Sequence, residues 1–174
     1  MLKKLSRPGG ASGFTLVELM IAVVVLAILV ALALPSFRTW LTNIQIRNAA
    51  SSVLAGIQRA RAEAVGRNAT VSFVMAADSS WTVNVGSPAT VIETRSASEG
   101  SQNVTRTVLP VGATTITFNN LGVVVPNSDG TASLSQLDFA ASGGDRDMRI
   151  TIGVGGNARM CDPSLPAGSS PGAC

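Results

Sequence analysis

Residues 14–34 read FTLVELMIAVVVLAILVALAL, an apolar run of 21 residues that contains one charge, Glu18. A helix of this length can cross the hydrocarbon core of a bilayer. The whole chain has 174 residues, of which 46% are hydrophobic and 13% charged. The charged share is about half of that usual in soluble domains. The run accounts for much of the apolar excess and predicts a transmembrane helix.

Length and composition limit what the rest of the chain can do. The 174 residues accommodate one domain with a sizeable core and one appended segment. The sequence contains no His and no Tyr, and its only cysteines are Cys161 and Cys174. Ser-His-Asp triads, Cys-His pairs, His-based metal sites and four-cysteine zinc sites are therefore impossible within the chain. We expect no enzyme, no catalytic residues, no cofactor and no metal.

The net charge of +3 comes from the N-terminal end of the sequence. Lys3, Lys4 and Arg7 precede the apolar run, and removal of residues 1–13 would leave ten Arg against ten Asp and Glu. A basic flank predicts that the N-terminal side stays in the cytoplasm and that the chain after Leu34 crosses the membrane. In a bacterium, this single-pass topology places the C-terminal domain in the periplasm.

The small residues 9–13 precede the apolar run, whereas a conventional secretory signal is cleaved after its apolar segment. Cleavage between Gly13 and Phe14 would leave the apolar helix on the product. Glu18 would then lie one helical turn from the new amino group of Phe14. An ionisable group in a membrane helix costs a few kcal/mol and by default marks a function. The Glu18 carboxylate would pair with the Phe14 amino group or with the amino group of a neighbouring copy. The alternative interpretation is that Glu18 is a tolerated charge near a helix end.

The segment Gly13-Phe14-Thr15-Leu16-Val17-Glu18 resembles the class III signal of type IV pilins and type II secretion pseudopilins. The resemblance implies that a prepilin peptidase cuts after Gly13 and methylates Phe14. It also implies that Glu18 guides docking into a growing filament and that Pro35 is a helix-loosening proline. The implied partners are the peptidase, other pilins or pseudopilins, the inner-membrane assembly platform and inner-membrane lipid.

A helical period continues from Ser36 to about Arg67. One arc predicts a face that packs on the chain's own sheet; it contains Ala50, Val53, Leu54, Ile57, Ala60 and Ala64. The preceding apolar residues project to roughly the opposite side; they are Phe37, Trp40, Leu41 and Ile44. We expect this second group to face neighbouring subunits or membrane, the alternative being irregular core packing throughout.

Residues 54–71 resemble the junction between helix and first strand in the GspH/FimT family, where an Ala-Arg-x-Glu-Ala segment leads to an Arg-Asn turn. Short runs rich in Val, Thr, Ile and Phe predict strands at 70–76, 81–85, 90–95, 104–109, 114–118, 122–125, 134–140 and 148–154. The resemblance implies an α+β pilin-like fold with two antiparallel sheets against the long helix. The expected segments are a leader at 1–13, a transmembrane segment at 14–35, an amphipathic continuation at 36–68 and a β-rich domain at 69–174.

The C-terminal tail contains both cysteines and several Pro and Gly residues. In an oxidising periplasm a disulfide between Cys161 and Cys174 is expected, and closing this loop would stabilise the fold by about 3 kcal/mol. Asp145 and Asp147 lie among glycines, but their spacing lacks a complete calcium loop. We therefore interpret that segment as a turn.

A second functional hypothesis concerns DNA. FimT-like minor pilins linked to natural transformation have a Gly-Arg-x-Arg segment before such a cysteine; here only Gly156 and Arg159 match, because Asn157 replaces the first Arg. The candidate DNA contacts are Asn157, Arg159, Arg149 and Arg146. Nearby aspartates would offset their charge, and DNA affinity depends on the number of phosphates neutralised. The leading hypothesis is a structural subunit of a type IV pilus or type II secretion pseudopilus. The alternative is a DNA-binding minor pilin in DNA uptake.

Overall fold

The computed structural model describes residues 13–174. The expected leader, with Lys3, Lys4 and Arg7, lies outside the described residues except for Gly13. The chain forms two compact units, of which one ends at Phe37 and the other comprises Arg38–Cys174. The helix α1, Leu16–Arg67, contributes residues to both units.

The C-terminal end of α1 has a well-defined cap. Asn68 adopts a left-handed conformation with φ of 50°. The N–H of Asn68 donates to the carbonyl of Val65, and the N–H of Ala69 donates to that of Ala64. Together these bonds form a Schellman motif, in which Asn substitutes for the more usual Gly. The helix therefore ends at the Arg-Asn turn that the sequence predicted.

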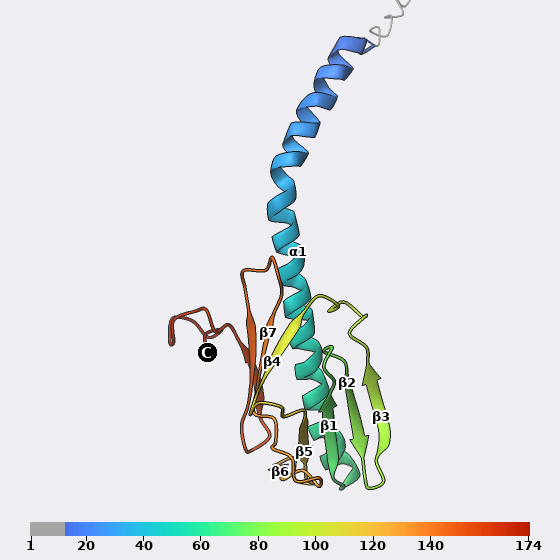
Figure 1. Cartoon of the computed structure of the whole chain (residues 1–174), viewed down its shortest axis with the longest axis vertical. Helices are drawn as coiled ribbons and strands as arrows, with labels where there is room; N and C mark the ends of the chain where they lie inside the picture. Colours follow the sequence, from blue (N-terminus) through green and yellow to red (C-terminus); the bar gives the residue numbers. More distant parts are fainter. Residues whose placement is uncertain (1–12) are drawn as a thin grey trace, which may run out of the picture. The chain divides into compact units, whose positions relative to one another are not determined.

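Two antiparallel sheets complete the unit 38–174, and Figure 1 shows strands on both sides of the lower part of α1. The first sheet has the order β3-β2-β1-β5-β6 and the second β4-β7-β8-β9. The first contains β1 (Val71–Met75), β2 (Trp81–Val85), β3 (Thr90–Arg95), β5 (Thr115–Phe118) and β6 (Val124–Val125). The second contains β4 (Thr105–Leu109), β7 (Gln136–Ala140), β8 (Met148–Ile152) and β9 (Ala158–Cys161). The predicted α+β fold is confirmed.

One hydrophobic cluster joins the helix to both sheets. The helix residues that it buries are Ile46, Ala49, Ala50, Val53, Gly56, Ile57, Ala60 and Ala64. The predicted arc is thus correct, although Leu54 is only half-buried. Of the four apolar residues expected to face outward, Phe37, Trp40 and Leu41 are 53%, 56% and 42% exposed, and Ile44 is half-buried. Their contact with neighbouring subunits or membrane stays a prediction.

Gly56 allows the first sheet to approach the helix closely. A Cβ atom at this position would lie 2.8 Å from Cε2 of Phe73 and 2.9 Å from Cε2 of Trp81. The rings of Phe73 and Trp81 pack with centroids 5.7 Å apart, and the indole N–H of Trp81 donates to Ser52 Oγ at 3.0 Å. Only a residue without a side chain fits between the helix and these rings. The sequence analysis did not identify this contact.

The main error of the prediction is the last strand. Eight predicted strands are present within about two residues of their expected bounds, but β9 was not predicted. Asn157–Met160 alternate between exposed and half-buried side chains, the period of a strand with one face on the core. The Gly153–Gly156 turn follows β8 directly, and its first two residues fall inside the strand predicted at 148–154.

Candidate functional site

The expected processing site lies immediately before the helix. Gly13, Phe14 and Thr15 are not helical, and Phe14 is 83% exposed. Thr15 is the N-cap: its Oγ1 accepts a hydrogen bond from the N–H of Glu18 at 3.2 Å. A Thr followed by Glu three residues later is the pattern of a capping box, and a carboxylate in the first turn also complements the helix dipole. Glu18 thus has a local role in helix initiation that the sequence analysis missed.

The apolar part of α1 is exposed among the residues that the structure describes. An 18-residue window has a mean hydropathy of 3.0, and none of it is buried. Length and composition make α1 the one helix of residues 13–174 that could cross a membrane. Pro35 lies inside α1, and helical structure is present on both sides of it. Glu18 is the single ionisable residue between Phe14 and Pro35.

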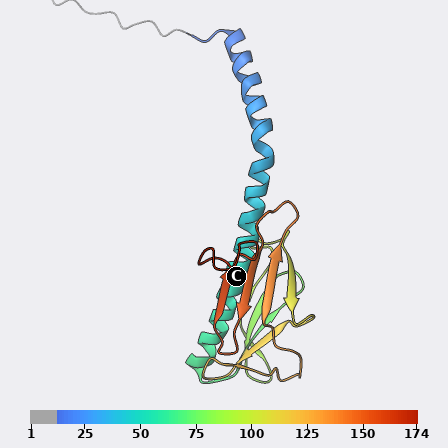
Figure 2. The same ribbon diagram turned by 90° about the vertical axis from the view of Figure 1, so that its left-hand side faces the viewer.

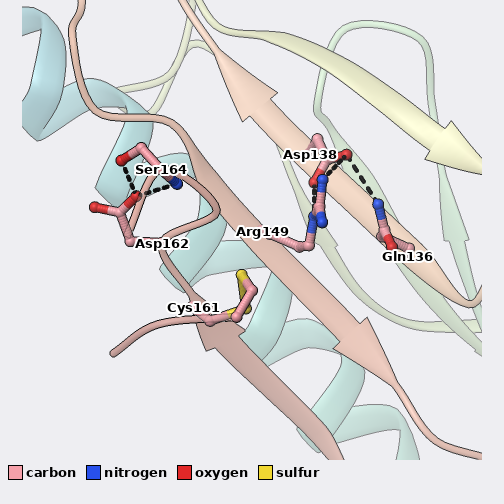
Figure 3. Close-up of polar contacts among 7 residues, drawn as sticks. Gln136, Asp138, Arg149, Cys161, Asp162 and Ser164 are labelled. Carbon is pink, nitrogen blue, oxygen red and sulfur yellow. Dashed lines mark hydrogen bonds and ion pairs between the residues drawn. A yellow bond between two sulfur atoms is a disulfide. The ribbon is translucent and has the colours of Figure 1, made fainter. Parts of the chain in front are cut away.

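The two cysteines are joined, as predicted, by a Cys161–Cys174 disulfide. The tail is also held by backbone bonds, because the N–H of Asp162 donates to Gly172 O at 2.7 Å and the N–H of Cys174 donates to Asp162 O. Figure 3 shows Asp162 accepting hydrogen bonds from the N–H and hydroxyl of Ser164. The disulfide therefore closes a tail that has its own local structure.

Two of the four candidate DNA contacts lie on one face of one sheet. Arg149 on β8 pairs with Cys161, and Arg159 on β9 pairs with Thr151, so both side chains lie on the face opposite the buried Ile150. Asn157 precedes β9 and lines a cavity with residues of α1, and Arg146 lies in the β7–β8 loop. The register therefore groups Arg149 with Arg159, while Asn157 and Arg146 lie outside the paired strands.

Both clustered arginines are engaged within the chain. Arg149 donates to both carboxylate oxygens of Asp138, at 2.6 and 3.1 Å (Figure 3). This hydrogen bonding raises the pKa of the Arg149 guanidinium above its ordinary value. Gln136 donates to the same carboxylate at 2.9 Å, and Arg159 donates to the carbonyl of Ala173 at 3.0 Å. A phosphate would have to compete with these acceptors.

The β8–β9 hairpin depends on Gly156, which matches the Gly of the DNA-associated motif. Gly156 has φ of +79°, and a Cβ atom there would overlap the carbonyl oxygen of Gly122. Arg61 of α1 donates to that same carbonyl at 3.0 Å. A cavity of about 680 Å³ lies between Arg61 on the helix and Asn157 on the hairpin. The structural requirement for Gly156 is therefore sufficient to explain its presence.

The predicted turn near Asp145 and Asp147 is present. Within it, the N–H of Gly144 donates to the carbonyl of Ala141 at 3.0 Å. Asp145 contacts the helix: Asn43 Nδ2 donates to Asp145 Oδ1 at 2.6 Å. Among residues 13–174, no group of three or more His, Cys, Asp or Glu side chains is arranged to hold a metal ion.

Two families match the sequence. The family described as type II transport protein GspH matches residues 49–156, and the prokaryotic N-terminal methylation motif matches residues 10–34. The first match covers more than half of the chain and includes the lower helix and β1–β8. A comparison with curated proteins found no match.

Solved structures of low sequence identity share the fold. The type IV minor pilin FimU of Pseudomonas aeruginosa is 19% identical, with a TM-score of 0.51 over 74% of this chain and 94% of that chain. The minor pseudopilin EpsH from the type 2 secretion system of Vibrio cholerae is 14% identical, with a TM-score of 0.50 over 70% of this chain and 99% of that chain. The predicted pilin-like fold is confirmed by these similarities. Given the match over residues 49–156, the chain belongs to the GspH family of pilin-like proteins.

Proposed function

We propose that the chain is a minor structural subunit of a type IV pilus or a type II secretion pseudopilus. The observation that carries this proposal is an apolar helical segment, exposed along its whole length, joined to a domain with a complete core. Such a segment needs an apolar environment, which a bilayer and a bundle of similar helices both supply. Function then comes from assembly, and no catalytic step is part of the proposal.

In this proposal a prepilin peptidase cuts after Gly13 and methylates Phe14. Support comes from the match to the N-terminal methylation motif and from the exposed, non-helical backbone at residues 13–15. The processed subunit waits in the inner membrane with residues 38–174 in the periplasm. The assembly platform then transfers it into the filament, where α1 packs against the helices of other subunits.

Glu18 is proposed to pair with the amino group of Phe14 in its own chain or in a neighbouring subunit. A carboxylate in the membrane costs a few kcal/mol unless it is paired. The hydrogen bond at Thr15 Oγ1 does not remove this cost, because it is made by the N–H of Glu18 and not by its carboxylate. A pairing partner therefore has to come from the processed N-terminus or from another subunit.

The proposal is tested by expressing the full chain with a prepilin peptidase in a host that assembles filaments. Mass spectrometry should show a product that begins with methylated Phe14, and sheared filaments should contain it. Glu18→Ala should be processed but should not enter filaments, whereas the matched control Glu99→Ala should enter them normally. An intact leader, loss of the whole apolar helix, or normal assembly of Glu18→Ala would contradict the proposal.

The second candidate function is DNA binding by the outer face of β8 and β9. It is favoured by the common face of Arg149 and Arg159, but both arginines already have acceptors in the chain. A gel-shift titration of the full chain in detergent tests it. Binding that weakens with salt and is lost in Arg159→Ala would support it, since phosphate contacts are salt-dependent. The absence of a gel shift at micromolar protein would contradict DNA binding.

A further inference from the structure

Three arginines differ from the others in having no acceptor. Residues 13–174 contain ten arginines. Seven form an ion pair with a carboxylate or donate to a carbonyl of the chain: Arg59, Arg61, Arg67, Arg95, Arg106, Arg149 and Arg159. The side chains of Arg38, Arg47 and Arg146 make no hydrogen bond or ion pair with any described residue. Arg38 and Arg47 lie on α1, and Arg146 lies in the β7–β8 loop.

Two of these arginines line the same cavity. Arg47 from α1 and Arg146 from the β7–β8 loop border a cavity of about 360 Å³. Its apolar lining comes from Trp40 and Ile44 of the helix and Met148 of β8. Figures 1 and 2 both show the β7–β8 loop beside α1. All of these residues lie within the unit 38–174.

The loop that carries Arg146 is fixed to the helix. Asn43 and Asp145 exchange two hydrogen bonds, from Asn43 Nδ2 to Asp145 Oδ1 at 2.6 Å and from the N–H of Asp145 to Asn43 Oδ1 at 3.1 Å. Gly144 packs so closely on Ile46 that a Cβ atom would lie 2.7 Å from its Cδ1. Arg146 follows this anchored pair directly. A fixed loop loses little conformational entropy when a ligand binds.

The cavity has an unbalanced charge. Its lining contains the guanidinium groups of Arg47 and Arg146 and one carboxylate, that of Asp145. Asp145 accepts from Asn43 and forms no ion pair with either arginine in the described chain. Arg, Trp and Met are enriched at the centres of protein interfaces. A partner that covered the cavity would leave buried cations unpaired unless it brought a carboxylate.

A lipid head group fits this site less well than a protein does. Arg47 follows Leu34 by 13 residues in the sequence, which corresponds to about 20 Å of helix at 1.5 Å per residue. The head-group layer extends only about 5–8 Å beyond the hydrocarbon core on each side. This length of helix exceeds the depth of the head-group layer, which favours a protein over a lipid as the occupant.

We propose that this cavity receives a carboxylate side chain from a neighbouring pilin-like subunit, with an adjacent apolar side chain against Trp40 and Met148. The carboxylate pairs with Arg47 and Arg146. The inference rests on the proposed function, because it requires the chain to enter a filament. It adds the chemistry that the neighbour must present.

Photo-crosslinking in cells that assemble filaments tests the inference. In the full chain, Trp40→p-benzoylphenylalanine places an aromatic crosslinker in the lining of the cavity. We expect a crosslink to a pilin-like subunit, within a few residues of an Asp or Glu identified by mass spectrometry. Adding Arg47→Gln and Arg146→Gln should lower the crosslink yield about tenfold or more, the loss expected for a close interfacial charge pair. The control Arg95→Gln, which breaks an exposed pair with Glu99, should leave it unchanged.

Each other outcome overturns the inference in a different way. A crosslink to phospholipid would identify a lipid site, and a crosslink insensitive to both Arg→Gln changes would identify a purely apolar contact. No crosslink from chains found in sheared filaments would show that the cavity stays open, while the proposed function stands. Absence of the chain from filaments would overturn the proposed function and this inference with it. Thermal unfolding of the variants would show that their folds are intact.

Discussion

Both parts of α1 carry apolar side chains, but these side chains have opposite surroundings. In Leu16–Leu34 the large hydrophobic side chains are exposed, from 45% for Leu34 to 75% for Leu16. Between Ile46 and Ala64, by contrast, eight residues are buried on one face. The buried face is built largely from small residues, which lets two sheets approach the helix, whereas the upper part is large and apolar on every side. One helix can therefore serve an external apolar environment and an internal core.

This contrast predicts that equal changes in the two parts have unequal effects on folding. Ile57 is fully buried and Ile28 is 56% exposed. Ile57→Ala should lower the free energy of unfolding by about 2–5 kcal/mol, through lost burial and the cavity left behind. Ile28→Ala should leave it nearly unchanged, because no atoms pack on that side chain in the folded domain. Denaturant unfolding of both full-length variants in the same detergent, followed by Trp81 fluorescence, checks this. Equal destabilisation would mean that the upper helix also contributes to the folded core.

The Cys161–Cys174 disulfide lies at the other end of the chain from the apolar run, and it tests how much the C-terminal tail contributes to folding. The double variant Cys161→Ser/Cys174→Ser should lose about 3 kcal/mol of unfolding free energy, since the crosslink restricts the unfolded chain. Wild-type protein under reducing conditions should unfold at the same denaturant concentration as the double variant. If instead the double variant is as stable as the oxidised wild type, the backbone bonds at Asp162 hold the tail without help.

Two helical glycines offer a matched pair within the lower part of α1. Gly56 lies against Phe73 and Trp81, whereas a Cβ atom at Gly66 would meet nothing within 4 Å. Gly56→Ala should destabilise by about 1–3 kcal/mol through overpacking. Gly66→Ala should stabilise by about 0.5–1 kcal/mol through helix propensity. The Tm should therefore fall in Gly56→Ala and rise in Gly66→Ala. A change of Tm in the same direction in both variants would show that packing at Gly56 does not determine how Gly56→Ala changes stability.

Much of this architecture could be predicted from the sequence. Periodicity gave the buried face of α1, and turn residues separated eight of the nine strands. What could not be predicted are contacts between residues far apart in the sequence. The pairs Asn43–Asp145 and Arg149–Asp138 connect different elements, and no local pattern indicates that these side chains will meet. The role of Gly56 was likewise hidden, because it depends on two aromatic rings from β1 and β2.

The candidate sites follow the same rule. Gly13, Phe14 and Glu18 form a local motif, so the sequence alone was sufficient to select them. The DNA candidates were chosen for charge, and the register of β8 and β9 then showed which of them share a face. Their engagement with Asp138 and Ala173 depends on tertiary structure. Charge in a sequence thus indicates candidates, but only the fold shows which charges are already paired.

The smallest expected effect concerns a charge cluster on the lower helix. Glu63 accepts from Arg67 and also pairs with Arg59 at 2.9 Å. The hydrogen bond from Arg67 is the main cause that lowers the pKa of Glu63 below its usual value. A carboxylate with a lowered folded-state pKa stabilises the fold above its unfolded pKa, near 4.5, and this stabilisation is lost as the pH falls through the folded value. Glu63→Gln should therefore lower Tm slightly at pH 7, and the Tm difference from wild type should shrink as the pH falls below 4.5 and through the folded-state pKa. The control Glu99→Gln removes a carboxylate that is 58% exposed and should change Tm less at pH 7. A Tm difference for Glu63→Gln that stays constant as the pH falls would assign the effect to packing of the side chain and not to its charge.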